Sequence, residues 1–157
     1  MTHSGIKHIH FPGVAVGSFL STECGRALAD LAHDESFQPL NDNLGPYTIE
    51  LSIQDSKLVL SIQNAKGEAL PSLILSLTPY RKLIKDYFLM IESYEQARAE
   101  GTAAKLETID MARRGLHDEA ADLMIDRLRG RIALDHGTAR RLFTLVCALM
   151  PGQFRAM

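Results

Sequence analysis

The sequence contains no tryptophan, only two cysteines and few aromatic residues, which make up 6% of its 157 positions. It lacks any apolar run near the roughly 20 residues that a helix needs to span a bilayer. Its first ten residues, MTHSGIKHIH, contain no hydrophobic block of the kind found in secretion signals. Neither sign of charge dominates, because the formal net charge is −2. These absences argue against a membrane protein and against attraction to nucleic acid through overall charge.

Cys24 and Cys147 lack the spacing of metal ligands, and both lie in apolar stretches expected to be helical. They are typical of small buried hydrophobic residues in a reducing compartment. We therefore expect a cytoplasmic bacterial protein. Charged residues make up 23% of the chain and apolar residues 46%, as in ordinary globular proteins. The length favours a single domain over residues 1–157, with the N-terminal 20 or so residues partly irregular.

Alternation of apolar and polar residues predicts several strands. The clearest segments are residues 47–54, 58–62 and 73–77. Asp55 and Ser56 form a short connection between the first two, which indicates a hairpin. An earlier strand is predicted over residues 6–11, with His8 and His10 on its solvent face. The pattern favours a small antiparallel β-meander of three to five strands.

Helical spacing of apolar residues predicts about four helices. The first follows Ser21 as N-cap, and the second runs from a Thr78 cap to Glu100 and stops at Gly101. The third has about 27 residues between Thr102 and Gly130, and the last covers residues 139–150 after an Asp135 cap. The second half of this last helix is apolar all round, so it should be the most buried. The fold class is therefore α+β, with helices over one face of the meander.

The third predicted helix carries a polar stripe beside its expected core face. That core face comprises Leu106, Ile109, Ala112, Leu116, Ala120 and Leu123. A row of acids, Asp118, Asp122 and Asp126, lies nearly opposite and should be solvated. Asp110, Arg113, Arg114 and His117 are spaced at 0, 3, 4 and 7 residues, so they share one stripe. Because Met124 and Leu128 continue this stripe with apolar side chains, we expect Arg113 and His117 to be partly covered by protein.

Three interpretations of this stripe remain open. It can be a polar seam, meaning a set of ion-paired side chains that fixes how the helix docks. It can instead be a site where two arginines hold a phosphate or carboxylate beside a titratable histidine. The third interpretation is an ordinary solvated face.

Further candidate binding residues are Arg81 and Lys85 in the second helix, and Arg140 and Arg141 in the last. An i,i+4 pair of Lys82 and Asp86 favours a solvated face for the first of these clusters. All the arginines form one basic patch only if the fold brings them together. The imidazoles of His8 and His10 lack further zinc ligands nearby. No phosphate-binding loop, GxSxG elbow or HExxH motif is present, and we expect no metal and no cofactor.

Several stretches give the chain a specific resemblance to a known family. They are Gly45–Tyr47, Leu75–Arg81, Lys85–Phe88, Ile109–Met111, Arg113–His117 and Thr138–Leu149. From about Leu31 to Leu149 the chain resembles the UPF0262 group of uncharacterised small bacterial proteins. The resemblance implies a cytoplasmic bacterial setting and supplies neither an activity nor catalytic residues. The UPF0262 group is similar in kind to families regarded as accessory proteins, and this similarity favours a non-enzymatic role.

Three functional hypotheses follow. The leading one is a non-enzymatic interaction or regulatory protein that binds a protein partner beside the helices beginning at Pro79 and Thr102. The second is an anionic small-molecule site at Arg113, Arg114 and His117, oriented by Asp110, with His117 as general acid or base if the site is catalytic. The third and least favoured is association with RNA or the ribosome. It requires seven cations to converge on one face: Arg81, Lys82, Lys85, Arg113, Arg114, Arg140 and Arg141.

Overall fold

The computed structural model describes residues 4–10 and 18–150 of the chain. Their strands are β1 (Ile6–His10), β2 (Gln38–Pro39), β3 (Tyr47–Gln54), β4 (Lys57–Gln63), β5 (Leu73–Ser76) and β6 (Ile132–Ala133). Their helices are α1 (Ser18–Leu31), the short 3₁₀ helix η1 (Thr78–Tyr80), α2 (Arg81–Glu100), α3 (Ala103–Leu128) and α4 (His136–Leu149). The predicted α+β class and its four α-helices are confirmed within these ranges.

The main sheet has the strand order β1-β3-β4-β5. Strands β3, β4 and β5 are antiparallel neighbours, as predicted. Asp55 and Ser56 connect β3 to β4 with φ angles of 51° and 62°, the backbone form that suits a two-residue hairpin. The expectation of a purely antiparallel meander is wrong, because β1 pairs with β3 in parallel. A parallel pair needs a long crossover connection, and α1 lies within it.

Strand β1 ends at His10, and Phe11 lies outside the described residues. Its His8 and His10 side chains are exposed, as predicted for the solvent face. The register shifts between Ile6 and His8, which interrupts the simple alternation of this strand. A second, smaller sheet contains the two-residue strand β6. This strand pairs antiparallel with β2, a partner that the sequence pattern did not indicate.

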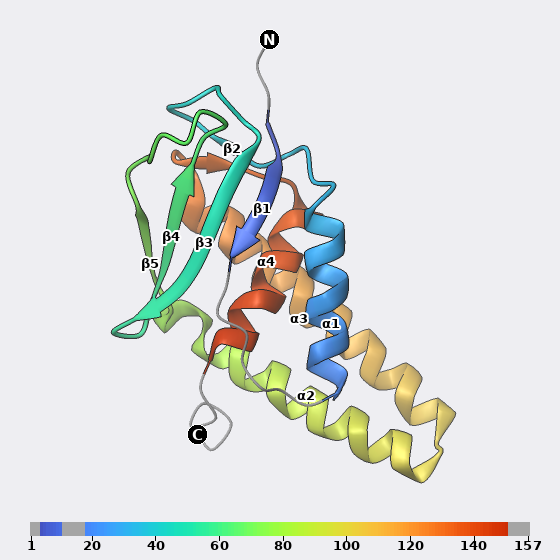
Figure 1. The fold of residues 1–157 in the computed structure, drawn as a ribbon. Coiled ribbons are helices and arrows are strands. Elements are labelled where there is room, and N and C mark those ends of the chain that lie inside the picture. The colour runs from blue at the N-terminus through green and yellow to red at the C-terminus, as the bar shows by residue number, and fades with distance from the viewer. Residues whose placement is uncertain (1–3, 11–17, 151–157) are drawn as a thin grey trace.

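The helices cover one face of the main sheet, and α4 lies between the sheet and the other helices (Figure 1). Helix α4 packs against α1, α3 and β3. All its residues from Leu142 to Leu149 are buried, which confirms the prediction that it is the most enclosed helix. Helices α2 and α3 form an antiparallel hairpin that extends away from the sheet (Figure 1). No described helix is long and apolar enough to cross a membrane.

The helix ends agree only in part with the predicted caps. Asp135 accepts a hydrogen bond at Oδ1 from the backbone N–H of Thr138 at 2.8 Å, and it caps α4 as predicted, although the helix begins already at His136. Gly101 ends α2 with a φ of 71°, also as predicted. Ser21 is not a cap, because α1 begins at Ser18. Thr78 makes no side-chain cap bond, because the chain enters α2 through the 3₁₀ turn of η1. Thr102 stands at the N-cap of α3 without such a bond.

The core face of α3 differs from the predicted one. Its buried residues are His117, Ala120, Ala121, Met124 and Leu128, whereas Ala112 is exposed. The buried face is therefore rotated toward the polar stripe. The reason is that α3 is held between two neighbours, α2 on one side and α4 on the other, and the apolar pattern alone does not show where those neighbours lie.

Candidate functional site

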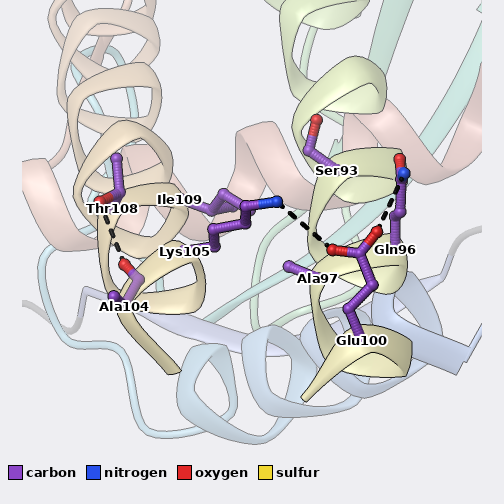
Figure 2. Close-up of a pocket in the computed structure, with 8 residues that line it drawn as sticks. All are labelled: Ser93, Gln96, Ala97, Glu100, Ala104, Lys105, Thr108 and Ile109. Atoms are coloured by element: carbon purple, nitrogen blue, oxygen red, sulfur yellow. Dashed lines mark hydrogen bonds and ion pairs between the residues drawn. The ribbon is translucent and has the colours of Figure 1, made fainter. Parts of the chain in front are cut away.

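One hollow lies between α2 and α3 and has a volume of about 500 Å³. Figure 2 shows that Lys105 and Gln96 both contact the carboxylate of Glu100. Lys105 Nζ lies 3.4 Å from Glu100 Oε2, and Gln96 Nε2 donates to Glu100 Oε1 at 3.3 Å. Thr108 donates to the carbonyl oxygen of Ala104 at 3.1 Å. Because one cation matches one anion here, this hollow presents no uncompensated charge to a ligand.

A smaller hollow of about 270 Å³ lies among α1, α3 and α4, and we call it the arginine hollow. It is lined by Glu23, Arg26, Ala27, Asp30, Arg113, Arg114, His117, Arg140, Arg141 and Thr144. The fold thus brings the stripe of α3 together with the two arginines predicted as candidates in α4. Asp110 is joined to this group through ion pairs. Arg81 and Lys85 are exposed on α2 and do not line the hollow.

Arg113 is held by acids from two helices. Its Nε and Nη2 donate to Asp110 Oδ1 at 3.0 and 2.8 Å, and its Nη1 donates to Glu23 Oε1 at 3.2 Å. The side chains of Arg113 and Glu23 are 26% and 14% exposed, so this contact is largely sheltered from water. The hydrogen bonds from Arg113 lower the pKa of Asp110 below its ordinary value, because they favour the ionised carboxylate. The sequence-based expectation that Arg113 is partly covered is confirmed.

Of the other four arginines that line the hollow, two have a carboxylate partner and two have none among the described residues. Arg114 Nη2 lies 2.9 Å from Asp110 Oδ2, and Arg141 Nε lies 3.4 Å from Asp30 Oδ2. Within the part of the chain that the structure describes, neither Arg26 nor Arg140 forms an ion pair with a carboxylate. The Nε of Arg140 is also buried without a hydrogen-bond acceptor among these residues. Five guanidinium groups thus face three carboxylates, which leaves two positive charges uncompensated.

His117 forms part of the hollow's wall and is 7% exposed. Its ring stacks on Tyr87 with the centroids 5.4 Å apart, and its Nε2 lies 3.5 Å from Thr144 Oγ1. Burial, followed by the charges of Arg113 and Arg140, lowers its pKa to about 4. The imidazole is therefore neutral at pH 7. It offers a hydrogen-bonding group to the hollow without adding a charge.

Sequence reasoning missed the contribution of α1. Glu23, Arg26 and Asp30 line the hollow, and they are spaced at 0, 3 and 7 residues on one face of that helix. That spacing was visible in the sequence.

The fold and the hollow define an α+β protein that gathers arginines from three helices around a small concave site. The UPF0262 family model, described as an uncharacterised protein family, matches residues 15–151. The chain belongs to this family, as the resemblance noted above implied.

Named relatives agree with this assignment. The chain is 48% identical over 123 residues to a UPF0262 protein of Rhizobium etli, with 78% of each chain covered. It is 48% identical over 124 residues to one from a Chelativorans species, covering 78% of this chain and 77% of the relative. It is 49% identical over 124 residues to one from Brucella canis, covering 78% of each. No solved structure matches the chain.

Proposed function

We propose that the protein is a non-enzymatic binding protein that holds a small anionic molecule in the arginine hollow. The observation that carries this proposal is the charge imbalance, with Arg26 and Arg140 left without a carboxylate in the described structure. Guanidinium groups present planar pairs of N–H donors that match the oxygens of phosphates and carboxylates. A negatively charged ligand would supply the acceptors that the protein itself does not.

The state of His117 supports binding over proton transfer. A general acid or base works best with a pKa near the operating pH. With a pKa of about 4, His117 is not an imidazolium at pH 7, so it cannot act as a general acid in that form and is a weak general base. Its place in the wall suits a neutral hydrogen-bonding partner for the ligand. The buried thiols of Cys24 and Cys147 fit a reducing compartment, so we expect the protein to act in the cytoplasm.

The proposal is tested by titration calorimetry of the wild-type protein with sodium phosphate, sodium sulfate and sodium citrate at pH 7.5. We expect saturable binding of at least one anion. Arg140→Met should weaken it tenfold or more, because a charge-assisted hydrogen bond contributes about 1.5–3 kcal/mol. The matched control is Arg98→Met, the same change at an exposed position of α2 that does not line the hollow.

Two results would count against the proposal. The first is that none of the three anions binds. The second is that Arg140→Met binds as well as the wild type. If either result is obtained and the Arg140→Met protein unfolds more readily than the Arg98→Met protein, the arginines serve as a polar seam between helices.

A second function, a protein-binding surface on the α2–α3 hairpin, is favoured by a different observation. Leu89 in α2 and Met111 in α3 are large apolar side chains with exposed fractions of 46% and 67%. Contiguous exposed apolar patches mark partner contacts, and we propose that these two residues belong to one such patch. A partner recovered in stoichiometric amount by the wild type and by Arg140→Met, and lost with Leu89→Glu or Met111→Glu, would support this function. Recovery that both Glu variants retain would contradict it.

RNA association is less well supported than either function. The hypothesis needs the basic side chains of α2 to join those of α3 and α4, and Arg81 and Lys85 do not line the arginine hollow.

A further inference from the structure

We propose that the arginine hollow selects small dianions over monoanions of similar size and shape. This inference rests on the proposed function and specifies the class of ligand. Two kinds of small molecule supply the same chemistry, a phosphomonoester and a dicarboxylate. Both place two negative charges within a short distance.

The number of charges in the hollow carries the argument. Asp110 is shared by Arg113 and Arg114, Glu23 pairs with Arg113, and Asp30 pairs with Arg141. These three carboxylates use up the charge of three guanidinium groups, and the equivalent of two remains. A ligand with one negative charge would leave one of these two positive charges unbalanced, and water screens the partly covered guanidinium group of Arg140 less than the exposed one of Arg26. A dianion would neutralise both of the remaining positive charges in the hollow.

The two uncompensated arginines come from different helices. Arg26 belongs to α1 and Arg140 to α4, and these helices pack against each other. A ligand that contacts both guanidinium groups would therefore bridge α1 and α4. The ion pair between Asp30 and Arg141 already joins the same two helices at the hollow. Anion binding should consequently stabilise their packing as well as occupy the site.

The size of the hollow and one buried donor further restrict the ligand. A volume of about 270 Å³ lies just below the usual range for drug-sized ligands of about 300–1,000 Å³. The wall also includes the neutral ring of His117 and the hydroxyl of Thr144, but Thr144 Oγ1 lies 3.5 Å from His117 Nε2 and 3.3 Å from the carbonyl oxygen of Arg140, so it already has partners within the protein. The buried Nε of Arg140, by contrast, is a donor without an acceptor in the described residues. A compact molecule rich in oxygen matches this combination.

The test uses two matched pairs of probes in titrations at pH 7.5 and constant ionic strength, which holds charge screening equal. Methyl phosphate is compared with dimethyl phosphate, and succinate with butyrate. We expect the dianion of at least one pair to bind tenfold or more tightly than its monoanion. The pair that shows the preference identifies the source of the two charges. If methyl phosphate binds, its affinity should fall between pH 7.5 and pH 5, because the second phosphate pKa is about 6.

Failure of this inference is distinguishable from failure of the proposed function. Equal affinities within both pairs would overturn the selection of dianions while leaving anion binding in place. Absence of binding by all four probes would overturn both.

Variants test the charge count directly. Arg140→Met removes one of the two uncompensated charges, so the preference for dianions should shrink to about threefold or less. Arg26→Met removes the other, and since Arg26 is exposed this variant provides the same test if Arg140→Met fails to fold. Arg98→Met should keep the wild-type preference. An undiminished preference in a folded Arg26→Met or Arg140→Met protein would overturn the inference.

Discussion

Arg113 in α3 donates a hydrogen bond from Nη1 to Oε1 of Glu23 in α1, over 3.2 Å and across 90 positions of the sequence. The same guanidinium group holds Asp110 in its own helix. Arg113 therefore fixes two carboxylates at the edge of the arginine hollow and links the helices that carry them. This contact is both a part of the candidate site and a part of the fold.

The link between Arg113 and Glu23 should contribute to stability. A double-mutant cycle of Arg113→Met and Glu23→Gln, measured by urea unfolding, is expected to give a coupling energy of about 1–2 kcal/mol, because the pair is sheltered. The control is the exposed pair of Lys82 and Asp86, with Nζ and Oδ2 3.0 Å apart, which should give about 0.2–1 kcal/mol. A Glu23–Arg113 coupling no larger than the control would show that this contact does not hold the helices together.

Acid should destabilise the protein through His117. The unfolded imidazole has a pKa near 6.5 and the folded one a pKa of about 4, so the unfolded state binds the proton first as the pH falls. The stability that the neutral imidazole of His117 contributes is therefore fully present above pH 6.5 and is lost as the pH falls from 6.5 to 4. Between pH 7.5 and pH 5 the expected loss is about 2 kcal/mol. In urea unfolding, the His117→Gln protein should not show this loss of stability between pH 7.5 and pH 5. The His33→Gln protein, an exposed control, should show the same loss as the wild type. Identical pH dependence in the wild type and His117→Gln would refute the assignment.

Two glycines should respond to alanine in opposite directions. Gly5 has a φ of +95°, and a Cβ there would overlap the carbonyl oxygen of Asp34. Gly5→Ala should therefore lower the free energy of unfolding by about 2 kcal/mol or more. Gly115 lies inside α3 with no atom near the position of a new Cβ, so Gly115→Ala should raise it by about 0.5–1 kcal/mol. Thermal unfolding of the two variants checks both signs, and a stable Gly5→Ala protein would contradict the described backbone contact.

Two buried tyrosines should differ in what their hydroxyl groups contribute. The hydroxyl of Tyr87 is buried without a hydrogen-bond partner among the described residues. That of Tyr47 donates to Asp42 Oδ2 at 2.9 Å. We expect Tyr87→Phe to leave stability unchanged or to raise it by up to about 1 kcal/mol, and Tyr47→Phe to lower it by about 1–2 kcal/mol. Denaturant unfolding of both variants measures the difference, and a larger loss for Tyr87→Phe would mean that its hydroxyl does have a partner.

Local features of the fold were predictable from the sequence. The hairpin at Asp55 and Ser56, the stop at Gly101 and the cap at Asp135 each depend on residues within a few positions of one another. The stripe containing Arg113 and His117 was also predictable, because helical spacing alone places those side chains on one face. Backbone geometry and nearest-neighbour chemistry specify such features without reference to long-range contacts.

Tertiary structure alone decided which elements meet. No alternation of residues in β1 reveals that its partner is β3 or that the pairing is parallel, since a strand's pattern records burial and not the identity of its neighbour. Likewise, the spacing within α1 and within α4 shows arginines on helix faces but not that Arg26 and Arg140 line one hollow. Contacts between residues more than a hundred positions apart depend on how all the helices pack around α4. The sequence by itself therefore determined most of the elements, and packing determined the buried face of α3, the pairing of β2 with β6 and the site that the helices form.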